Sequence, residues 1–305
     1  MAEKITLKYP DVPDIDLNAV FKGESTELDF VFQGLLANTV GALIAPGASG
    51  KSMYALQALM SIACSVAGGD ILNLKPKYHG QVTLLSAEDP LSILTDRLRS
   101  IGSHLSTAAR EEVTENMHVK CCTGFLIDIT TTEGMAWLKR MSEGQRLVVL
   151  DTISRYHRLD ENNNGQMAWL IQILEHVCTA TGATILFLHH VSKYSAWEGS
   201  CDKQQAARGA SALVDNSRWA GYIRKMTPRE TEHYIDPDFG RIGVDANWRY
   251  VQYGVSKCNY DVAPAPRWFR RENGGVLIPV DLIKVPKKKA AKAIVAREGD
   301  DNERW

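Results

Sequence analysis

Short apolar runs that end in glycine-rich or polar turns recur along the first two thirds of the chain. Four of these runs predict buried strands, at residues 39–44, 82–86, 147–150 and 184–188. Apolar residues at helical spacing lie between them, most clearly over residues 166–181, where Gly182 is placed to end the helix. Pro90 suits the first turn of another helix, which we expect to reach about Gly102.

Strands that alternate with helices predict a parallel sheet with right-handed crossovers. Two later runs, residues 219–223 and 250–256, follow each other more closely in the sequence and predict strands at a sheet edge. The pattern therefore predicts an α/β fold with a mostly parallel central sheet and antiparallel edge strands.

The patterned region is flanked by two segments of a different character. Residues 1–33 carry Pro10, Pro13 and mixed charges with weak periodicity, so we expect an N-terminal arm or a short cap. Residues 284–305 contain three consecutive lysines from Lys287 and predict a basic, flexible tail. A single domain of residues 34–283 lies between them, which suits a chain of 305 residues.

Composition narrows the class of protein further. Hydrophobic residues make up 45% of the chain, enough for a full core, and the formal net charge of −1 argues against a surface that is basic throughout. A locally basic channel remains compatible with that charge. No apolar run approaches the roughly 18 residues of a membrane span, and no signal-peptide stretch follows Met1, so we expect a cytoplasmic protein that does not contact membranes. None of the six cysteines lies in a C-x-x-C pair, so no zinc site is expected.

A glycine-rich turn follows the first predicted strand. Residues 45–52 are Ala-Pro-Gly-Ala-Ser-Gly-Lys-Ser, which matches a phosphate-binding P-loop except that Ala45 replaces its first glycine. Lys51 would supply charge to phosphates, and Ser52 a hydroxyl to Mg²⁺. The backbone N–H groups that would converge on phosphate oxygens belong to Gly47, Ala48, Ser49 and Gly50. The alternative is a glycine turn that binds no phosphate.

Acidic residues follow two other predicted strands. Asp151 ends an apolar strand, where an aspartate can hold Mg²⁺ through water, although an aspartate there can also cap a turn. The next residue is Thr152, so a general base must come from elsewhere. Glu88 lies just past the strand at 82–86 and is the candidate base, because ligands bind at the carboxyl ends of parallel strands. Asp89 competes for that role, or acts as the N-cap of the Pro90 helix.

Two histidines, His189 and His190, end the fourth predicted strand. Either one could contact a γ-phosphate or the attacking water, and the alternative is a pair of ordinary polar residues. Because no cysteine or carboxylate clusters nearby at metal spacing, a metal site is not expected here.

A long polar segment interrupted by glycine follows these histidines, and loops of this length are functional or disordered. Lys193, Lys203 and Arg208 could contact a DNA backbone, and Tyr194 or Trp197 could stack on bases. The alternative is a solvated surface loop.

Taken together, these segments resemble the RecA-fold hexameric helicases, and most closely the replicative helicases of broad-host-range plasmids. The resemblance covers about residues 34 to 280, and its segments occur in the same order as in those helicases. Its matching segments are residues 40–52, 86–90, 149–152, 187–193, 204–219, 254–260, and 267–271 together with 274–277. The P-loop is generic, whereas the stretch that ends in Arg218-Trp219 and the last two segments are specific.

The resemblance implies roles for individual residues. In one subunit, Lys51 and Ser52 would bind nucleotide and metal, Asp151 would be the Walker-B residue, Glu88 would activate water, and His190 would sense the γ-phosphate. Arg218 resembles an arginine finger that reaches the neighbouring subunit's site, and Lys257 lies where related helicases have a second trans-acting cation. Both could instead be surface charges that flank strands.

The resemblance also implies cofactors and partners. We expect ATP and Mg²⁺, a homohexameric ring, and single-stranded DNA gripped by central loops near residues 155–165 and 192–208. The expected activity is unwinding of plasmid DNA at its origin, with a plasmid initiator protein and a primase as partners. Two alternatives remain open, a RecA-fold recombinase or KaiC-like regulatory ATPase, and a nucleotide-gated binding module with little turnover.

Overall fold

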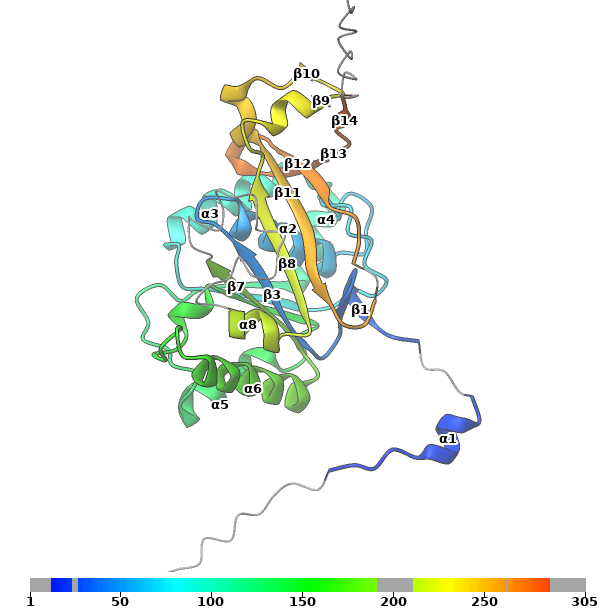
Figure 1. Cartoon of the computed structure of the whole chain (residues 1–305). Coiled ribbons are helices and arrows are strands. Elements are labelled where there is room, and N and C mark those ends of the chain that lie inside the picture. The colour runs from blue at the N-terminus through cyan, green and yellow to red at the C-terminus, as the bar shows by residue number, and fades with distance from the viewer. Residues whose placement is uncertain (1–11, 24–26, 191–210, 262, 286–305) are drawn as a thin grey trace, which may run out of the picture.

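A nine-stranded sheet organises the described part of the chain (Figure 1). The computed structural model describes residues 12–23, 27–190, 211–261 and 263–285. In spatial order the strands are β13 (Leu277–Val280), β12 (Arg267–Arg271), β11 (Tyr250–Cys258), β8 (Trp219–Lys225), β3 (Val40–Ala45), β7 (Thr184–His190), β6 (Leu147–Asp151), β4 (Val82–Ser86) and β5 (Met117–Cys121).

The sheet changes direction at β8. Every pairing from β5 to β8 is parallel, whereas β8 pairs antiparallel with β11, and β11, β12 and β13 continue as an antiparallel meander. The predicted α/β fold is therefore confirmed. The expected place of residues 219–223 and 250–256 at the edge was wrong, because β8 lies between β3 and β11, and β11 lies between β8 and β12.

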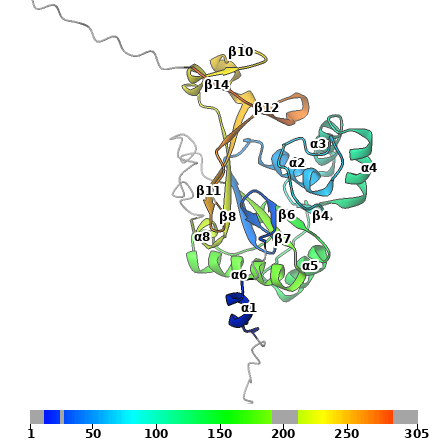
Figure 2. The ribbon, with the colours of Figure 1, turned by 90° about the vertical axis from the view of Figure 1, so that its right-hand side faces the viewer.

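Helices cover both faces of the sheet (Figure 2). One face carries α2 (Lys51–Ala63), α3 (Leu91–Gly102) and α4 (Thr107–Asn116); the other carries α5 (Thr132–Ser142), α6 (Asn164–Thr181) and α8 (Ser211–Asn216). Strand residues alternate between two apolar clusters, so Leu43 packs on the α2 side and Ile44 on the α6 side. Burial on both faces explains why the central strands are continuous apolar runs. Among the described residues, no helix is both long enough and apolar enough to cross a bilayer.

A small lobe extends the sheet beyond β8 and β11. It contains β9 (Tyr234–Asp236), β10 (Gly240–Arg241) and β14 (Ile283–Lys284), which form a three-stranded sheet. Arg270 of β12 fixes this lobe through an ion pair to Asp236, whose side chain is fully buried. Tyr250 donates its hydroxyl to the same carboxylate at 2.7 Å.

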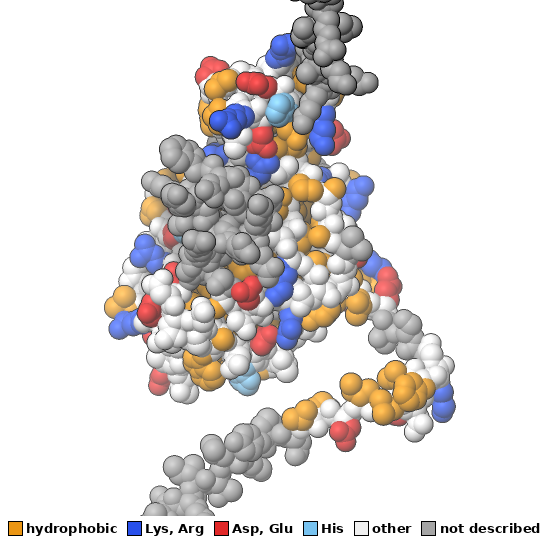
Figure 3. Space-filling view, viewed as in Figure 1, with side chains coloured by type: hydrophobic (Ala, Val, Ile, Leu, Met, Phe, Trp, Pro, Cys, Tyr) orange, Lys and Arg blue, Asp and Glu red, His pale blue; other side chains and the backbone are white. Residues whose placement is uncertain are grey.

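The N-terminal segment contains an exposed helix and a buried hairpin. Helix α1 (Leu17–Phe21) has no buried residue, and hydrophobic side chains gather around it in Figure 3. Strand β1 (Phe30–Phe32) pairs with β2 (Leu35–Leu36), and Phe32 packs edge-on against Trp219 with ring centroids 5.5 Å apart. The folded body therefore begins at β1, a few residues before the boundary expected from the sequence. Lys284, the first residue of the expected basic tail, is instead the last residue of β14, and the three lysines from Lys287 lie outside the described residues.

Candidate functional site

The loop between β3 and α2 curls around a cavity of about 310 Å³. Two residues make the curl by adopting left-handed backbone conformations, Ala48 with φ 56° and Gly50 with φ 100°. The Ser49 hydroxyl donates to the Pro46 carbonyl oxygen at 2.7 Å and fixes the turn. Because the first N–H groups of a helix lack intrahelical acceptors, the start of α2 presents donors and a positive dipole end to an anion in this cavity.

Lys51 and Asp151 form a buried ion pair beneath the loop. Their Nζ and Oδ1 atoms are 3.4 Å apart, and the two side chains are 4% and 1% exposed. Removal of either partner would leave an uncompensated buried charge, which is costly. Ser52 lines the cavity beside Lys51. The structure thus brings together the predicted phosphate-binding lysine, the predicted metal-binding hydroxyl and the predicted Walker-B carboxylate.

Glu88 and His190 form a second pair at the same cavity. The His190 Nε2 atom lies 3.2 Å from both carboxylate oxygens of Glu88, although the two residues are 102 positions apart in the chain. The hydrogen bond from His190 lowers the pKa of the Glu88 carboxyl, and the positive charges of Lys51 and Arg155 lower it further, against the opposing effect of burial. Glu88 is therefore ionised at neutral pH and able to accept a proton.

The two histidines at the end of β7 face opposite sides of the sheet. His190 is exposed and lines the cavity, whereas His189 is buried with no hydrogen-bond partner for Nδ1 among the described residues. Burial lowers the pKa of His189 to about 4, so its ring is neutral at neutral pH. The geometry places His190 at the cavity and His189 behind it.

Asp89 lines the same cavity as Glu88 but does not cap the helix that follows it. Helix α3 has Pro90 as its N-cap and no side-chain cap, so the expected capping role was wrong. Asp89 instead forms an ion pair with Arg97 of the same helix. Its carboxylate is thus engaged by a guanidinium, which leaves Glu88 as the acidic residue that faces His190.

Arg218 and Lys257 lie at the opposite end of β3 from the cavity. Trp219 pairs with Gly41 near the start of β3, and strands rise about 3.3 Å per residue, so Arg218 lies on the order of 15 Å from its own P-loop. The Arg218 side chain is 52% exposed, and its Nε lies 3.9 Å from Glu175.

Lys257 lies close to Arg218 at this end of the sheet. Its Nζ donates to the Asp215 carbonyl oxygen at 2.6 Å, and its pKa is lowered by burial and by the charge of Arg218. The structure therefore brings these two cations together but away from their own chain's cavity.

Some predicted site residues are not described, and several cavity residues, Arg97 and Arg271 among them, were missed. Lys193, Lys203 and Arg208, with the aromatic residues of their loop, lie outside the described residues. Arg271 lines the cavity, but sequence reasoning gave it no role. Arg271 belongs to the segment 267–271 that carries the resemblance, but its contact depends on how β12 packs against a loop more than 200 residues earlier, which no local pattern reveals.

The residues present fit a nucleoside triphosphate with Mg²⁺. The loop supplies N–H donors, Lys51 supplies a charge, and Ser52 and Asp151 are oxygen ligands of the kind that Mg²⁺ prefers. Among the described residues, no group of three or more histidine, cysteine, aspartate or glutamate side chains could hold a metal ion.

Comparisons with known proteins agree with this geometry. The family described as an AAA domain matches residues 4–196. One solved ATPase domain has a TM-score of 0.57 at 13% identity, with 89% of this chain and 100% of that chain covered. A DnaB-like replicative helicase, solved with its interactions with primase, has the same TM-score and identity, with 88% of this chain and 67% of that chain covered. At such low identity, the likeness shows a shared RecA-like fold.

Proposed function

Because this chain belongs to the AAA domain family and folds like the ATPase domain of a replicative helicase, we propose that it is an ATP-driven DNA helicase. It would hydrolyse ATP, assemble as a ring and move along single-stranded DNA. The observation that carries this proposal is the convergence of Lys51, Asp151, Glu88 and His190 around one cavity at the carboxyl ends of four neighbouring parallel strands.

Each of these side chains has a task that its environment supports. Lys51 exchanges its partner Asp151 for phosphate oxygens when nucleotide binds. Glu88, kept ionised by His190, orients the attacking water and accepts its proton. A bound Mg²⁺ would neutralise phosphate charge. His190 is in hydrogen-bond contact with the proposed base, so it is well positioned to respond when the γ-phosphate leaves.

The position of Arg218 supports catalysis across a subunit interface. It is too far from its own cavity to contact a bound phosphate, yet it is exposed and accompanied by Lys257. An arginine supplied by a neighbouring subunit can accelerate phosphoryl transfer by ~10³–10⁵. We propose a homohexamer in which Arg218 and Lys257 complete the adjacent site.

The DNA partner is proposed from sequence resemblance together with fold. The central loops would be those near residues 155–165 and 192–208, with Lys193, Lys203 and Arg208 on the DNA backbone. The resemblance to plasmid replicative helicases of the RepA type leads us to propose origin unwinding of plasmid DNA in the cytoplasm, with an initiator protein and a primase as partners.

Unwinding of a forked duplex tests the proposal. We expect Lys51→Ala and Arg218→Ala to abolish unwinding and to lower single-stranded-DNA-stimulated hydrolysis by at least ~100-fold. Arg218→Ala should still bind ATP, because Arg218 would act at the nucleotide site of the adjacent subunit. Arg241→Ala, which removes an exposed arginine of the small lobe, is the matched control and should leave both activities unchanged.

Three results would point elsewhere. Strand exchange without unwinding would favour a recombinase. Hydrolysis that single-stranded DNA leaves unchanged would favour a regulatory ATPase or a nucleotide-gated binding module. Equal loss of ATP binding in the two variants would place Arg218 in its own subunit's site.

A further inference from the structure

Arg271, the last residue of β12, reaches over the phosphate-binding loop of its own chain. Its Nη2 donates to the Ala48 carbonyl oxygen at 3.2 Å. A Cβ atom added to Gly50 would lie 3.3 Å from that nitrogen, so the guanidinium lies directly against the loop backbone. The guanidinium also lines the cavity that contains Lys51 and Ser52.

This guanidinium has no carboxylate partner among the described residues. The contrast is with the adjacent Arg270, which forms ion pairs with Asp236, Asp238 and Glu272 and has a raised pKa. The pKa of Arg271 is instead lowered by burial. A guanidinium carries five N–H donors, and one carbonyl acceptor leaves most of them unused. A half-buried cation with spare donors at an anion-binding loop is arranged to receive an anion.

The position of Arg271 is fixed by two contacts of the β12–β13 hairpin. Gln57 of α2 is fully buried and exchanges two hydrogen bonds of 2.8 Å with the backbone of Leu277. The turn packs on α3 so tightly that a Cβ added to Gly274 would lie 2.2 Å from the Ser100 hydroxyl oxygen. The helix that begins with Lys51 thus holds the hairpin that carries Arg271, so the positions of Lys51 and Arg271 relative to each other are fixed.

Arg271 approaches the loop from the side opposite to the proposed catalytic pair. In the sheet, β12 lies on one side of β3, whereas the strands that end at Glu88 and His190 lie on the other. It contacts Ala48 and Gly50, which precede Lys51 in the loop. Arg271 and the proposed catalytic pair thus line one cavity from opposite sides.

We propose that Arg271 binds, in its own chain, a nucleotide phosphate that remains after cleavage of the γ-phosphate. This inference rests on the nucleotide site of the proposed function and adds a residue of the same subunit to it. Arg271 exchanges the Ala48 carbonyl oxygen for a phosphate oxygen, and the ligand is a nucleoside di- or triphosphate.

The test is the affinity of Arg271→Gln for a fluorescent ADP analogue and for ATP. Loss of a charge-assisted hydrogen bond should weaken ADP and ATP about equally, by roughly 10- to 100-fold. The affinity for inorganic tripolyphosphate, measured by displacement of the analogue, should fall by a similar factor. This competitor has no base, so it tests the phosphate contact alone. Arg271→Lys should recover part of the loss. Circular dichroism melting identifies a variant that fails to fold.

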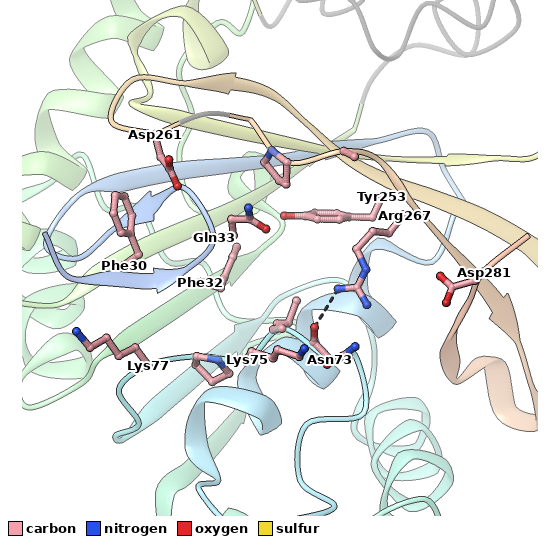
Figure 4. Close-up of a pocket in the computed structure, with 14 residues that line it drawn as sticks. Phe30, Phe32, Gln33, Asn73, Lys75, Lys77, Tyr253, Asp261, Arg267 and Asp281 are labelled. Carbon is pink, nitrogen blue, oxygen red and sulfur yellow. Dashed lines mark hydrogen bonds between the residues drawn. The ribbon is translucent and has the colours of Figure 1, made fainter.

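Arg267→Gln is the matched control. Arg267 begins the same strand, but its guanidinium donates to the Asn73 carbonyl oxygen at 3.0 Å in a separate cavity of about 590 Å³ (Figure 4). Its loss should leave ADP affinity unchanged.

Two outcomes would overturn the inference. A folded Arg271→Gln chain that binds ADP as tightly as the unaltered chain would remove Arg271 from the phosphate site. Weaker ADP binding with unchanged tripolyphosphate competition would assign Arg271 to the base instead. Lys51→Ala separates this failure from failure of the proposed function: if it too leaves ADP binding intact, the cavity is not a nucleotide site.

Discussion

At the scale of single residues, the Glu88–His190 pair decides how the site responds to pH. Because the pKa of Glu88 lies below its ordinary value, its carboxylate stays ionised to lower pH than a free glutamate would. Hydrolysis that depends on this base is present above the pKa of Glu88 and is lost as pH falls through it. The lowered pKa thus moves that loss toward more acidic solutions.

Removal of His190 should reverse this shift. His190→Ala takes away the largest cause of the lowered pKa, so the acid limb of kcat should move to higher pH. The measurement is kcat at saturating ATP from pH 8 down to below the ordinary pKa of a glutamate, expressed relative to the maximum of each variant. Arg155→Gln removes a smaller cause and should move the limb less. An acid limb at the same pH in all three proteins would contradict the role of Glu88 as base.

The residues of the site that could be predicted are those that a local motif or a strand end identifies. A P-loop is contiguous, and Asp151 and Glu88 could be predicted because catalytic carboxylates follow buried strands. The choice between His189 and His190 depends on which face of β7 meets the cavity, which strand alternation alone does not reveal. Arg271 escaped prediction because tertiary packing, and no local pattern, brings it to the loop.

At the scale of elements, burial decided what could be predicted. The central strands are apolar on both faces, and their ends were correct to within about two residues. Strand β5 was missed because its residues, Met-His-Val-Lys-Cys, are half-exposed and carry no apolar run. Strand β12 was missed because charged residues lie at three of its five positions. These outer strands are identified by their partners and not by their own sequences.

The buried amide of Gln57 makes an element-scale prediction. Gln57→Met conserves volume but leaves the N–H and the carbonyl of Leu277 without partners, so it should lower the free energy of unfolding by about 2–4 kcal/mol. Gln172→Met, on the exposed side of α6, should change it by less than ~0.5 kcal/mol. Urea titration followed by circular dichroism measures both free energies of unfolding. Equal effects would show that the two hydrogen bonds between Gln57 and Leu277 contribute nothing.

At the scale of the whole molecule, the separation of Arg218 from its own cavity makes a prediction about mixtures. Lys51→Ala chains retain Arg218, and Arg218→Ala chains retain the phosphate loop, so an interface is intact when the Arg218→Ala chain supplies the loop and the Lys51→Ala chain supplies the arginine. In a random equal mixture about a quarter of interfaces have this arrangement. Co-assembled mixtures should therefore recover a measurable fraction of the hydrolysis that each variant lacks alone.

A steady-state ATPase titration of one variant with the other measures this recovery. Light scattering establishes whether a mixed oligomer forms. If it forms and the mixture stays as inactive as the separate variants, Arg218 acts within its own subunit. Mixing of either variant with an Arg241→Ala chain supplies the reference for subunit exchange.

Strand β8 has a mechanical consequence. It begins directly after Arg218, and it ends at Lys225, whose pKa is lowered by burial and by the charge of Arg271. Seven residues of strand span roughly 23 Å; β11 pairs with β8 along this length, and β3 pairs with its first four residues. One continuous strand thus connects the cavity of a protomer to the end that carries Arg218, which would contact the next protomer. In a closed ring, a displacement at one nucleotide site would be transmitted along β8 to the adjacent site without a hinge.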